Sequence, residues 1–317
     1  MARLAKAPRQ IKATIMKRLL IVYNPRSSRY AEIEQEILSR ARELSGYLVG
    51  KYEVANTDID DNVRQLSKLL KDGDLVLSAG GDATAIIAAN AVLNSKKQAT
   101  LAVLPYGNFN DLARTLRTKT FDDIFLQDTA VRNLYPLEII VDGNFYRYST
   151  CYVTIGMMAE SVGLYNEPKM RRKLKKKFGR SVSSYTQLAS WYFKNRRNHI
   201  FLPEFKLNGV LQPKKSSDYA AVNGRSMARV MKGGEDYRDP KYFRHKVDRL
   251  TSFYRLVILM SKSILSRIPG AATDGDILEF TNPSTITIQA EGESTTFKNV
   301  KTIEIRKGKQ CLKVIEN

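Results

Sequence analysis

Cysteine and histidine, two residue types that build many enzyme sites, are scarce in this 317-residue chain. It contains two cysteines, Cys151 and Cys311, and two histidines, His199 and His245. Neither cysteine lies in a Cys-x-x-Cys or Cys-x-x-His spacing, so the sequence indicates neither a disulfide framework nor a zinc site. His199 stands in a basic stretch, which argues against a histidine-based catalytic triad, and both histidines are expected to be solvated.

Long apolar runs are also missing from the sequence. No run approaches the roughly 18 residues of a membrane-spanning helix, and the N-terminus lacks the apolar segment of a secretory signal. We therefore expect a cytoplasmic protein or one attached peripherally to a membrane. Hydrophobic residues make up 43% of the chain, which excludes a disordered basic tail and predicts one or two packed domains.

Acidic residues are too few to balance the basic ones. The chain has 32 Asp and Glu against 52 Lys and Arg, which gives a formal charge of +20. A charge of this size predicts an anionic partner, which can be nucleic acid, a membrane surface or a polyanionic small substrate. No RNP, zinc-finger or helix-turn-helix signature accompanies the charge, so we expect no specific nucleic acid among the partners.

Many of the basic residues lie in one stretch that contains no acid, between Glu167 and Glu204. Apolar and aromatic residues interleave them at spacings typical of helices with one basic and one apolar face. We therefore predict that residues 169–197 bind an anionic membrane surface, the alternative being a solvated helix face over the core. The eleven basic residues are Lys169, Arg171, Arg172, Lys173, Lys175, Lys176, Lys177, Arg180, Lys194, Arg196 and Arg197.

Residues 1–15 are basic and precede the first regular pattern, which starts near Lys17. We expect them to be a flexible leader, or an extension produced by an upstream start. An organellar targeting segment is the alternative, although this leader has no serine and few large apolar residues.

Residues 16–130 alternate short apolar runs with segments of helical periodicity, which predicts an α/β nucleotide-binding domain with a parallel sheet. The expected strands are 47–54 and 75–77, and the ranges 19–25 and 101–107 are each expected to hold a strand and the turn that ends it. The expected helices cover 33–44, 61–70 and 85–93.

Residues 131–317 have a β-rich pattern and are predicted to form a sandwich-like lipid-binding domain, with the extreme C-terminus able to return to the first domain. Hairpins are expected at 142–144 and 208–209, and short strands with turns at Gly292 and Gly308 should follow. An amphipathic helix over 250–268 is expected to cover a sheet, the alternative being a membrane anchor.

Three polar turns should meet at the carboxyl ends of the parallel strands, where ligands bind in sheets of this kind. The Gly80-Gly81 pair allows close approach of a phosphate, and the helix expected to start near Thr84 favours negative charge. Asp82 is suited to orient a phosphate that carries a cation. Each turn taken singly fits a plain strand-to-helix connection as well. The three turns are 24–28, with the phosphate donors Arg26, Ser27 and Ser28, then 80–84, and 105–111.

Taken together, NPRSS, GGDAT and PYGNFNDLAR resemble the motifs of the diacylglycerol kinase and sphingosine kinase family of lipid kinases, which is distantly related to NAD kinases. Their order and spacing agree with that family's Asn-Pro turn, GGDGT and P-x-GTxND blocks. KKKFGRSVSSYTQL and AEGES resemble later family segments, so the likeness spans about residues 17–317. The matching residues are Asn24, Gly80, Gly81, Asp82, Thr84, Gly107, Asn110, Asp111 and Arg114.

The resemblance implies a two-domain kinase that transfers the γ-phosphate of ATP to a lipid hydroxyl at a membrane surface, with Mg²⁺ as cofactor. It implies that Glu293 is the general base and that Asp82 helps to place Mg²⁺. A structural metal site is implied near 233–248, where Asp248 is the weak candidate ligand. A homodimer is left open. The residues implied to hold the nucleotide are Asn24, Arg26, Ser27, Thr57, Gly80, Gly81, Thr84, Gly107, Asn108 and Asn110.

Departures from the family motifs support an alternative, a nucleotide- or lipid-binding pseudokinase. Ala83 adds a methyl group where the family has glycine, Asn108 replaces a threonine beside the bulky Phe109, and Glu291 stands where the family has aspartate. From sequence alone, Glu291-Gly292-Glu293 also fits an exposed acidic hairpin turn.

Overall fold

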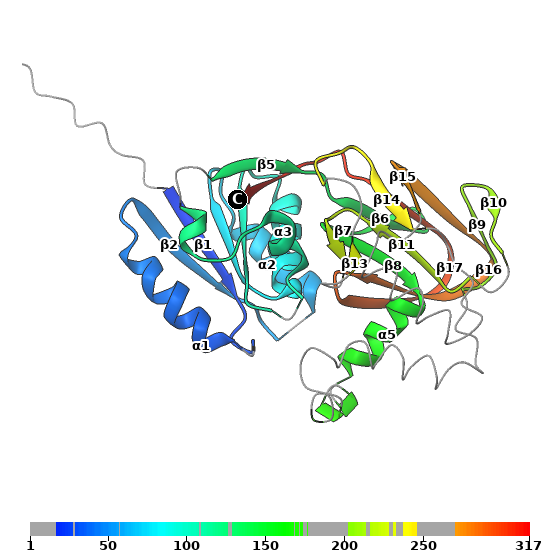
Figure 1. The fold of residues 1–317 in the computed structure, drawn as a ribbon, viewed down its shortest axis with the longest axis horizontal. Coiled ribbons are helices and arrows are strands. Elements are labelled where there is room, and N and C mark those ends of the chain that lie inside the picture. The colour runs from blue at the N-terminus through cyan, green and yellow to red at the C-terminus, as the bar shows by residue number, and fades with distance from the viewer. Residues whose placement is uncertain are drawn as a thin grey trace, which may run out of the picture.

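The computed structural model (Figure 1) describes most of the chain between Lys17 and Asn317. The basic stretch of residues 169–197 lies almost entirely outside the described residues, as does the helix expected over 250–268. The described residues are 17–27, 29–56, 58–107, 109–125, 129–167, 169–170, 172–173, 176, 202–213, 216–227, 231–232, 237–245 and 270–317.

The N-terminal part of the described chain contains a six-stranded sheet in the order β2-β1-β3-β4-β18-β5. Neighbouring strands are parallel from β2 through β18, and β5 is antiparallel to β18. The C-terminal strand β18 therefore lies inside the first sheet (Figure 1). The strands are β1 (Lys17–Tyr23), β2 (Tyr47–Glu53), β3 (Leu75–Gly80), β4 (Thr100–Pro105), β5 (Ala130–Leu134) and β18 (Leu312–Glu316).

Helices cover both faces of this sheet, which explains why its strands are continuous apolar runs rather than alternating ones. Ile33 and Ile37 pack on one face, and α2 and α3 pack on the other face, toward the second sheet (Figure 1). The helices are α1 (Tyr30–Ile33), the π-helical η1 (Glu34–Ser39), the 3-10 helix η2 (Arg40–Glu43), α2 (Ile59–Leu69), α3 (Asp82–Ser95), α4 (Asp111–Leu116) and the 3-10 helix η3 (Asp122–Ile124).

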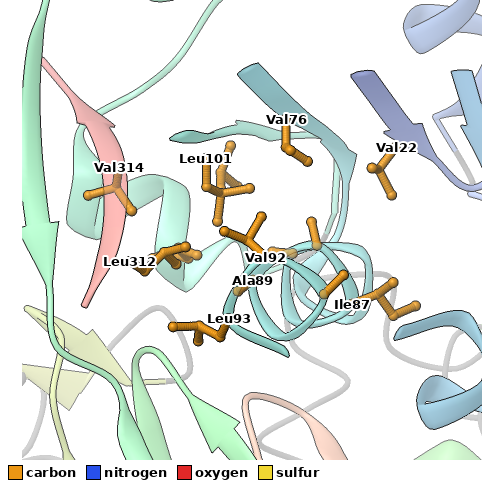
Figure 2. Packing of buried hydrophobic residues seen from close by; sticks show 14 of the residues in the cluster. Val22, Val76, Ile87, Ala89, Val92, Leu93, Leu101, Leu312 and Val314 are labelled. Carbon is orange, nitrogen blue, oxygen red and sulfur yellow. The ribbon is translucent and has the colours of Figure 1, made fainter. Parts of the chain in front are cut away.

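The α3 side of the sheet holds a core that reaches beyond the first sheet. Figure 2 shows Ile87, Val92 and Leu93 of α3 packed against Val76 and other strand residues. The same cluster includes residues of the second part of the chain. These are Cys151, Tyr152, Val222, Met227 and Tyr237. The two parts of the molecule therefore share buried apolar contacts.

Two helix starts differ from the positions expected from the sequence. α2 begins at Ile59 rather than Asp61, because the Asp58 carboxylate accepts a hydrogen bond from the Asp61 backbone N–H at 2.7 Å and caps the first turn. α3 begins directly at Asp82 rather than near Thr84. Asp82 itself therefore lies in the first turn of a helix.

The second sheet is antiparallel and has the order β15-β14-β11-β8-β16-β17-β6-β7, with β9 and β10 attached beside β16. Its core includes Ile139, Val153, Tyr219, Ile288 and Ile305. Its strands are β6 (Leu137–Val141), β7 (Asn144–Ser149), β8 (Tyr152–Gly156), β9 (Phe205–Leu207), β10 (Val210–Leu211), β11 (Asp218–Val222), β14 (Tyr242–His245), β15 (Gly270–Thr273), β16 (Gly275–Ala290) and β17 (Glu293–Lys307). A separate small ladder joins β12 (Ser226–Met227) and β13 (Met231–Lys232).

One expectation for the last strands was wrong. They were expected to be short, but β16 and β17 have 16 and 15 residues and form one long hairpin with shifts of register near 279–286. At Gly308 the chain turns out of β17 and enters β18 in the first sheet. The Gly308 N–H donates to Pro136 O at 2.7 Å, so the two crossings between the sheets are joined.

His245 was expected to be solvated and is instead 5% exposed on β14, with its ring 5.3 Å from the Phe243 ring in an edge-to-face contact. The prediction failed because the basic residues that follow His245 in the sequence do not reveal that β14 lies inside the sheet. His199 lies outside the described residues.

The architecture confirms the predicted fold class, an α/β part with a parallel sheet followed by a β-rich part. The hairpins expected at 142–144 and 208–209 join β6 to β7 and β9 to β10. Among the residues that the structure describes, no helix is long and apolar enough to cross a membrane.

The helix α5 (Met157–Asn166) starts against the half-buried carboxylate of Asp218, which gives the first testable prediction. Asp218 accepts a hydrogen bond from Met158 N at 2.7 Å, and burial raises the pKa of Asp218 to about 8 despite that bond. A raised pKa stabilises the fold at low pH, and this contribution is lost as pH rises from about 4 through about 8. Asp218→Asn should therefore flatten the fall in unfolding free energy over this range, by up to about 1.4 kcal/mol per pH unit.

Urea unfolding at pH 5, 6, 7 and 8 measures this slope. The exposed Asp274, changed to Asn, is the matched control and should leave the slope as it is in the unchanged protein. Equal slopes for Asp218→Asn and the unchanged protein would contradict the prediction.

Candidate active site

The turn after β1 is held by its own side chains. The Asn24 side-chain oxygen accepts a hydrogen bond from Arg26 N at 2.9 Å, which tightens the turn. The Arg26 guanidinium donates to Ala55 O at 2.9 Å and to the Asn56 side chain, and Ser27 Oγ donates to Tyr106 O at 3.4 Å. Arg26 and Ser27 therefore connect the carboxyl ends of β1, β2 and β4, and Arg26 already binds protein oxygens.

The turns after β3 and β4 touch through their glycines. A Cβ atom on Gly107 would lie 2.3 Å from the Gly81 Cα, and a Cβ on Gly80 would lie 2.4 Å from Thr84 Oγ1. A larger residue at Gly107 would therefore force the backbone to move, and one at Gly80 would force Thr84 to shift. The buried Thr84 side chain packs against Gly80 and so holds the turn after β3 in place.

Asn110 fixes the turn after β4 and has a left-handed backbone conformation, with φ 57°. Its side-chain oxygen accepts from Gly107 N at 2.7 Å, and its side-chain nitrogen donates to Gly107 O at 2.9 Å. Asn110 thus shapes the glycine turn through hydrogen bonds within the protein.

Asp82 joins the two glycine turns. Its carboxylate accepts from Asn110 N at 3.1 Å and from Asp111 N at 2.8 Å, so it also caps α4. Burial raises the pKa of Asp82, and these backbone hydrogen bonds and the Arg114 charge oppose the rise. Asp82 is therefore a fixed, half-buried carboxylate at the carboxyl end of the parallel sheet.

Glu291 comes from the second sheet, in the turn between β16 and β17, and it is only 3% exposed. The alternative of an exposed acidic turn is therefore wrong for this residue. Its carboxylate accepts hydrogen bonds from residues 149–151, where β7 ends and before β8 begins. Burial raises the pKa of Glu291, and the Asp82 charge raises it further. The hydrogen bonds from residues 149–151 oppose this rise in pKa. The donors are Ser149 Oγ at 2.8 Å, Thr150 N, Thr150 Oγ1 at 2.9 Å and Cys151 N at 2.6 Å.

The carboxylates of the two sheets lie around one pair of buried side chains. Burial raises the pKa of the Cys151 thiol and of the Tyr152 hydroxyl well above their ordinary values. The same three charges raise both further, namely those of Asp82, Asp111 and Glu291. The Gly80–Asp82 turn of the first sheet, here called the phosphate-type turn, and the Glu291–Glu293 turn of the second sheet, here called the acidic turn, therefore converge.

Glu293 ends the acidic turn as the first residue of β17 and is half-buried. Burial raises the pKa of Tyr146, and the Asp60 and Glu293 charges raise it further. The Arg147 charge and the hydrogen bond to Thr295 oppose this rise in pKa. Tyr146 donates to Thr295 Oγ1 at 2.7 Å, and the Arg147 guanidinium lies over the Tyr146 ring at 4.8 Å. Glu293 thus lies where β17 approaches β7.

Three residues predicted for the site, Thr57, Asn108 and Asp248, lie outside the described residues, and so does Ser28. The sequence analysis missed the 149–151 segment and Tyr152. Its only signal was a row of small polar residues, Ser149 and Thr150, at the end of a strand. Small polar residues of this kind are common in loops. Ser149 and Thr150 contact Glu291 only because β16 is long enough to carry Glu291 to them.

A separate cavity of about 710 Å³ lies near the crossing at Gly308 and contains none of the predicted site residues. Its lining includes Arg238, Arg306 and Lys307. Arg306 binds Glu138 at 2.8 Å, and Lys307 Nζ donates to Asn223 and to backbone carbonyls. Because these cations are paired within the protein, the cavity lacks the features of an anion site.

A model of the diacylglycerol kinase catalytic domain family matches residues 18–138. This part of the chain is similar to that family. The matched range contains the glycine turns and Asp82 but ends before the acidic turn of Glu291. The resemblance predicted from the motifs is therefore confirmed for the part of the site that contains the glycine turns and Asp82.

Two curated relatives match the same part of the chain. A diacylglycerol kinase of Bacillus subtilis (strain 168) is 32% identical over 137 residues, which cover 41% of this chain and 44% of that protein. One of Staphylococcus epidermidis (strain ATCC 35984) is 30% identical over 146 residues, which cover 45% of this chain and 40% of that protein. The matches span less than half the length of either relative.

Solved structures extend the likeness of fold to nearly the whole chain. A diacylglycerol kinase structure from Bacillus anthracis str. Sterne gives a TM-score of 0.66 at 16% identity and covers 95% of this chain and 97% of that chain. A second structure from the same organism gives a TM-score of 0.69, also at 16% identity, and covers 96% and 99%. At this identity the likeness concerns the fold alone.

Proposed function

We propose that the protein is an ATP-dependent lipid kinase that transfers the γ-phosphate to a hydroxyl of a diacylglycerol-like or sphingoid lipid. The observation that carries the proposal is the convergence of Asp82 and Glu291, from two different sheets, around Cys151 and Tyr152. The match of residues 18–138 to the model of the diacylglycerol kinase catalytic domain family supports the same activity.

The transfer needs positioning of the nucleotide and one proton acceptor near the lipid. In the proposed reaction the lipid hydroxyl oxygen forms a bond to the γ-phosphorus, and the bond from that phosphorus to the bridging oxygen of ADP breaks. Glu293 takes the hydroxyl proton. The nucleotide phosphates lie against the backbone of Gly80, Gly81 and Gly107, which have no side chain to block them.

The divalent metal in this proposal is Mg²⁺ bound together with the nucleotide. Among the residues that the structure describes, no group of three metal-binding side chains is present. Mg²⁺ commonly binds through one or two carboxylates plus substrate phosphates and water, and the fixed Asp82 carboxylate fits that mode. The metal would neutralise phosphate charge there. The structural metal site proposed near Asp248 concerns residues that the structure does not describe.

The test is transfer of labelled phosphate from ATP to diacylglycerol or sphingosine in mixed micelles with Mg²⁺. We expect phosphorylation of one of these lipids by the unchanged protein, and loss of most of the activity in Asp82→Asn. Absence of transfer to every such lipid would overturn the proposal and favour the pseudokinase alternative that Ala83 and Glu291 suggested.

The proposal includes an anionic membrane surface as partner, through residues 169–197. Because lysine binds such surfaces mainly by charge, binding should weaken with salt. Neutralising Lys173, Lys175, Lys176 and Lys177 together should remove up to about 4 kcal/mol of binding, at about 1 kcal/mol per residue. Sedimentation with vesicles containing phosphatidylserine measures this, with neutral vesicles as control. Binding that is insensitive to salt and to these substitutions would contradict it.

A further inference from the structure

Asn90 joins a helix of the first sheet to the edge of the second sheet. It lies on α3 and is 3% exposed. Its side-chain nitrogen donates to Tyr148 O at 3.0 Å, and its side-chain oxygen accepts from Tyr148 N at 3.0 Å. The second proton of the side-chain nitrogen goes to Ile86 O at 3.0 Å. Both backbone groups of Tyr148 are thus bound by a single side chain.

Tyr148 lies on β7, which ends the order of strands in the second sheet. The outer edge of such a strand offers backbone groups with no neighbouring strand to bind them. Asn90 binds these groups as a neighbouring strand would, so β7 is fixed relative to α3 by two hydrogen bonds of ordinary length. The Arg147 guanidinium adds an ion pair to Asp60 at 2.8 Å, at the start of α2.

In one direction from Asn90, the helix leads to the phosphate-type turn. Asp82 is the first residue of α3, and Asn90 follows eight residues later on the same uninterrupted helix. Eight residues of α-helix span about 12 Å, and a buried helix keeps that distance nearly constant. The position of Asn90 therefore follows the position of Asp82.

In the other direction, β7 leads to the acidic turn. The strand ends at Ser149, and the segment 149–151 donates the four hydrogen bonds that hold the Glu291 carboxylate. Glu293 lies two residues beyond Glu291. The path from Asp82 through α3, Asn90 and β7 to Glu291 is continuous in covalent and hydrogen bonds.

We propose that Asn90 is a positioning residue that sets the place of the Glu291–Glu293 turn relative to the Gly80–Asp82 turn. This inference rests on the proposed function for its catalytic meaning, because Asp82 and Glu293 act there on opposite partners of one transfer. Such a transfer needs alignment to a fraction of an ångström, and a misplacement of about 1 Å costs roughly a hundredfold in rate. Asn90 itself touches neither the phosphate-type turn nor the acidic turn.

The first test does not depend on activity. Asn90→Ala removes both hydrogen bonds to Tyr148, and we expect amide hydrogen exchange to become about tenfold faster at Thr150 and Cys151, whose N–H groups bind Glu291. Val92→Ala, on the same helix and in the same core, is the control and should leave exchange at these amides unchanged. Equal exchange at Thr150 and Cys151 in the two variants would overturn the proposal.

The second test separates positioning from stability by kinetics. In Asn90→Ala we expect kcat for lipid phosphorylation to fall by about 10- to 100-fold, while the Kd for ATP changes less than about twofold. Val92→Ala should keep kcat within about threefold at a temperature where both variants are folded. A kcat for Asn90→Ala equal to that of the control would overturn the positioning role.

Two further outcomes also bear on the positioning role of Asn90. If Asn90→Ala does not fold, Asn90→Asp replaces it. Aspartate keeps the acceptor for Tyr148 N and loses the donor to Tyr148 O. Unchanged amide hydrogen exchange at residues 149–151 in Asn90→Asp would then overturn the proposal. If the unchanged protein phosphorylates no lipid, the proposed function fails, whereas faster exchange in Asn90→Ala still supports the link between the two turns.

Discussion

Replacing Glu293 with glutamine is expected to lower kcat for lipid phosphorylation by about 10²- to 10⁴-fold, the usual contribution of a general base. Glutamine keeps the size of the side chain but cannot take a proton from the lipid hydroxyl. ATP binding should change less than about twofold, because the glycine turns of the first sheet are untouched. Initial rates at saturating ATP and lipid, together with nucleotide binding by calorimetry, measure both quantities.

Glu279→Gln is the matched control, because Glu279 is exposed on β16, the strand that precedes the acidic turn. It should retain full activity. A Glu293→Gln variant with the kcat of the unchanged protein would remove Glu293 from the reaction. Glu291 and Asp82, whose charges act on Cys151 and Tyr152, would then be the remaining candidates for the general base.

Replacing Gly107 with alanine is expected to weaken ATP binding by tenfold or more and to destabilise the fold by about 1–3 kcal/mol. The new Cβ would lie 2.3 Å from the Gly81 Cα and 2.8 Å from the Asn110 side-chain oxygen. Backbone cannot yield as a flexible side chain can, so the turns after β3 and β4 must separate. Their separation moves Asp82 and the amides that would face the phosphates.

Gly275→Ala is the control for this substitution, because a Cβ there would meet its nearest neighbour at 3.6 Å, an ordinary contact. Urea unfolding and ATP titration of both variants give the two quantities. Tight ATP binding by Gly107→Ala would show that the contact between the two glycine turns is not needed by the nucleotide.

Much of the first half was predictable because its signals are local. Short apolar runs followed by Gly80-Gly81 or by Asn24-Pro25 mark the ends of buried parallel strands, and such ends meet at one edge of a sheet. The structure places those turns together through the Arg26, Asn110 and Asp82 hydrogen bonds. The functions assigned to these residues stay predictions, which the substitutions above test.

The second half was less predictable because its contacts join distant segments. His245 looked solvated beside lysine and arginine, yet β14 lies within the antiparallel sheet and buries it. Glu291 looked like one acid in an exposed turn, yet a strand of 16 residues carries it to Ser149 and Thr150, about 140 positions earlier in the chain. Strand length and register depend on pairing partners, which local periodicity does not contain.

The fold class, the three polar turns and the family resemblance could be inferred from local sequence, because hydrophobic period, glycine and turn residues act over a few positions. The burial of Glu291 among residues 149–151 and the binding of Asn90 to the edge of β7 became visible in the folded chain alone. A buried carboxylate or amide is stable only where enough hydrogen-bond partners meet it. Those partners come from segments that folding alone brings together.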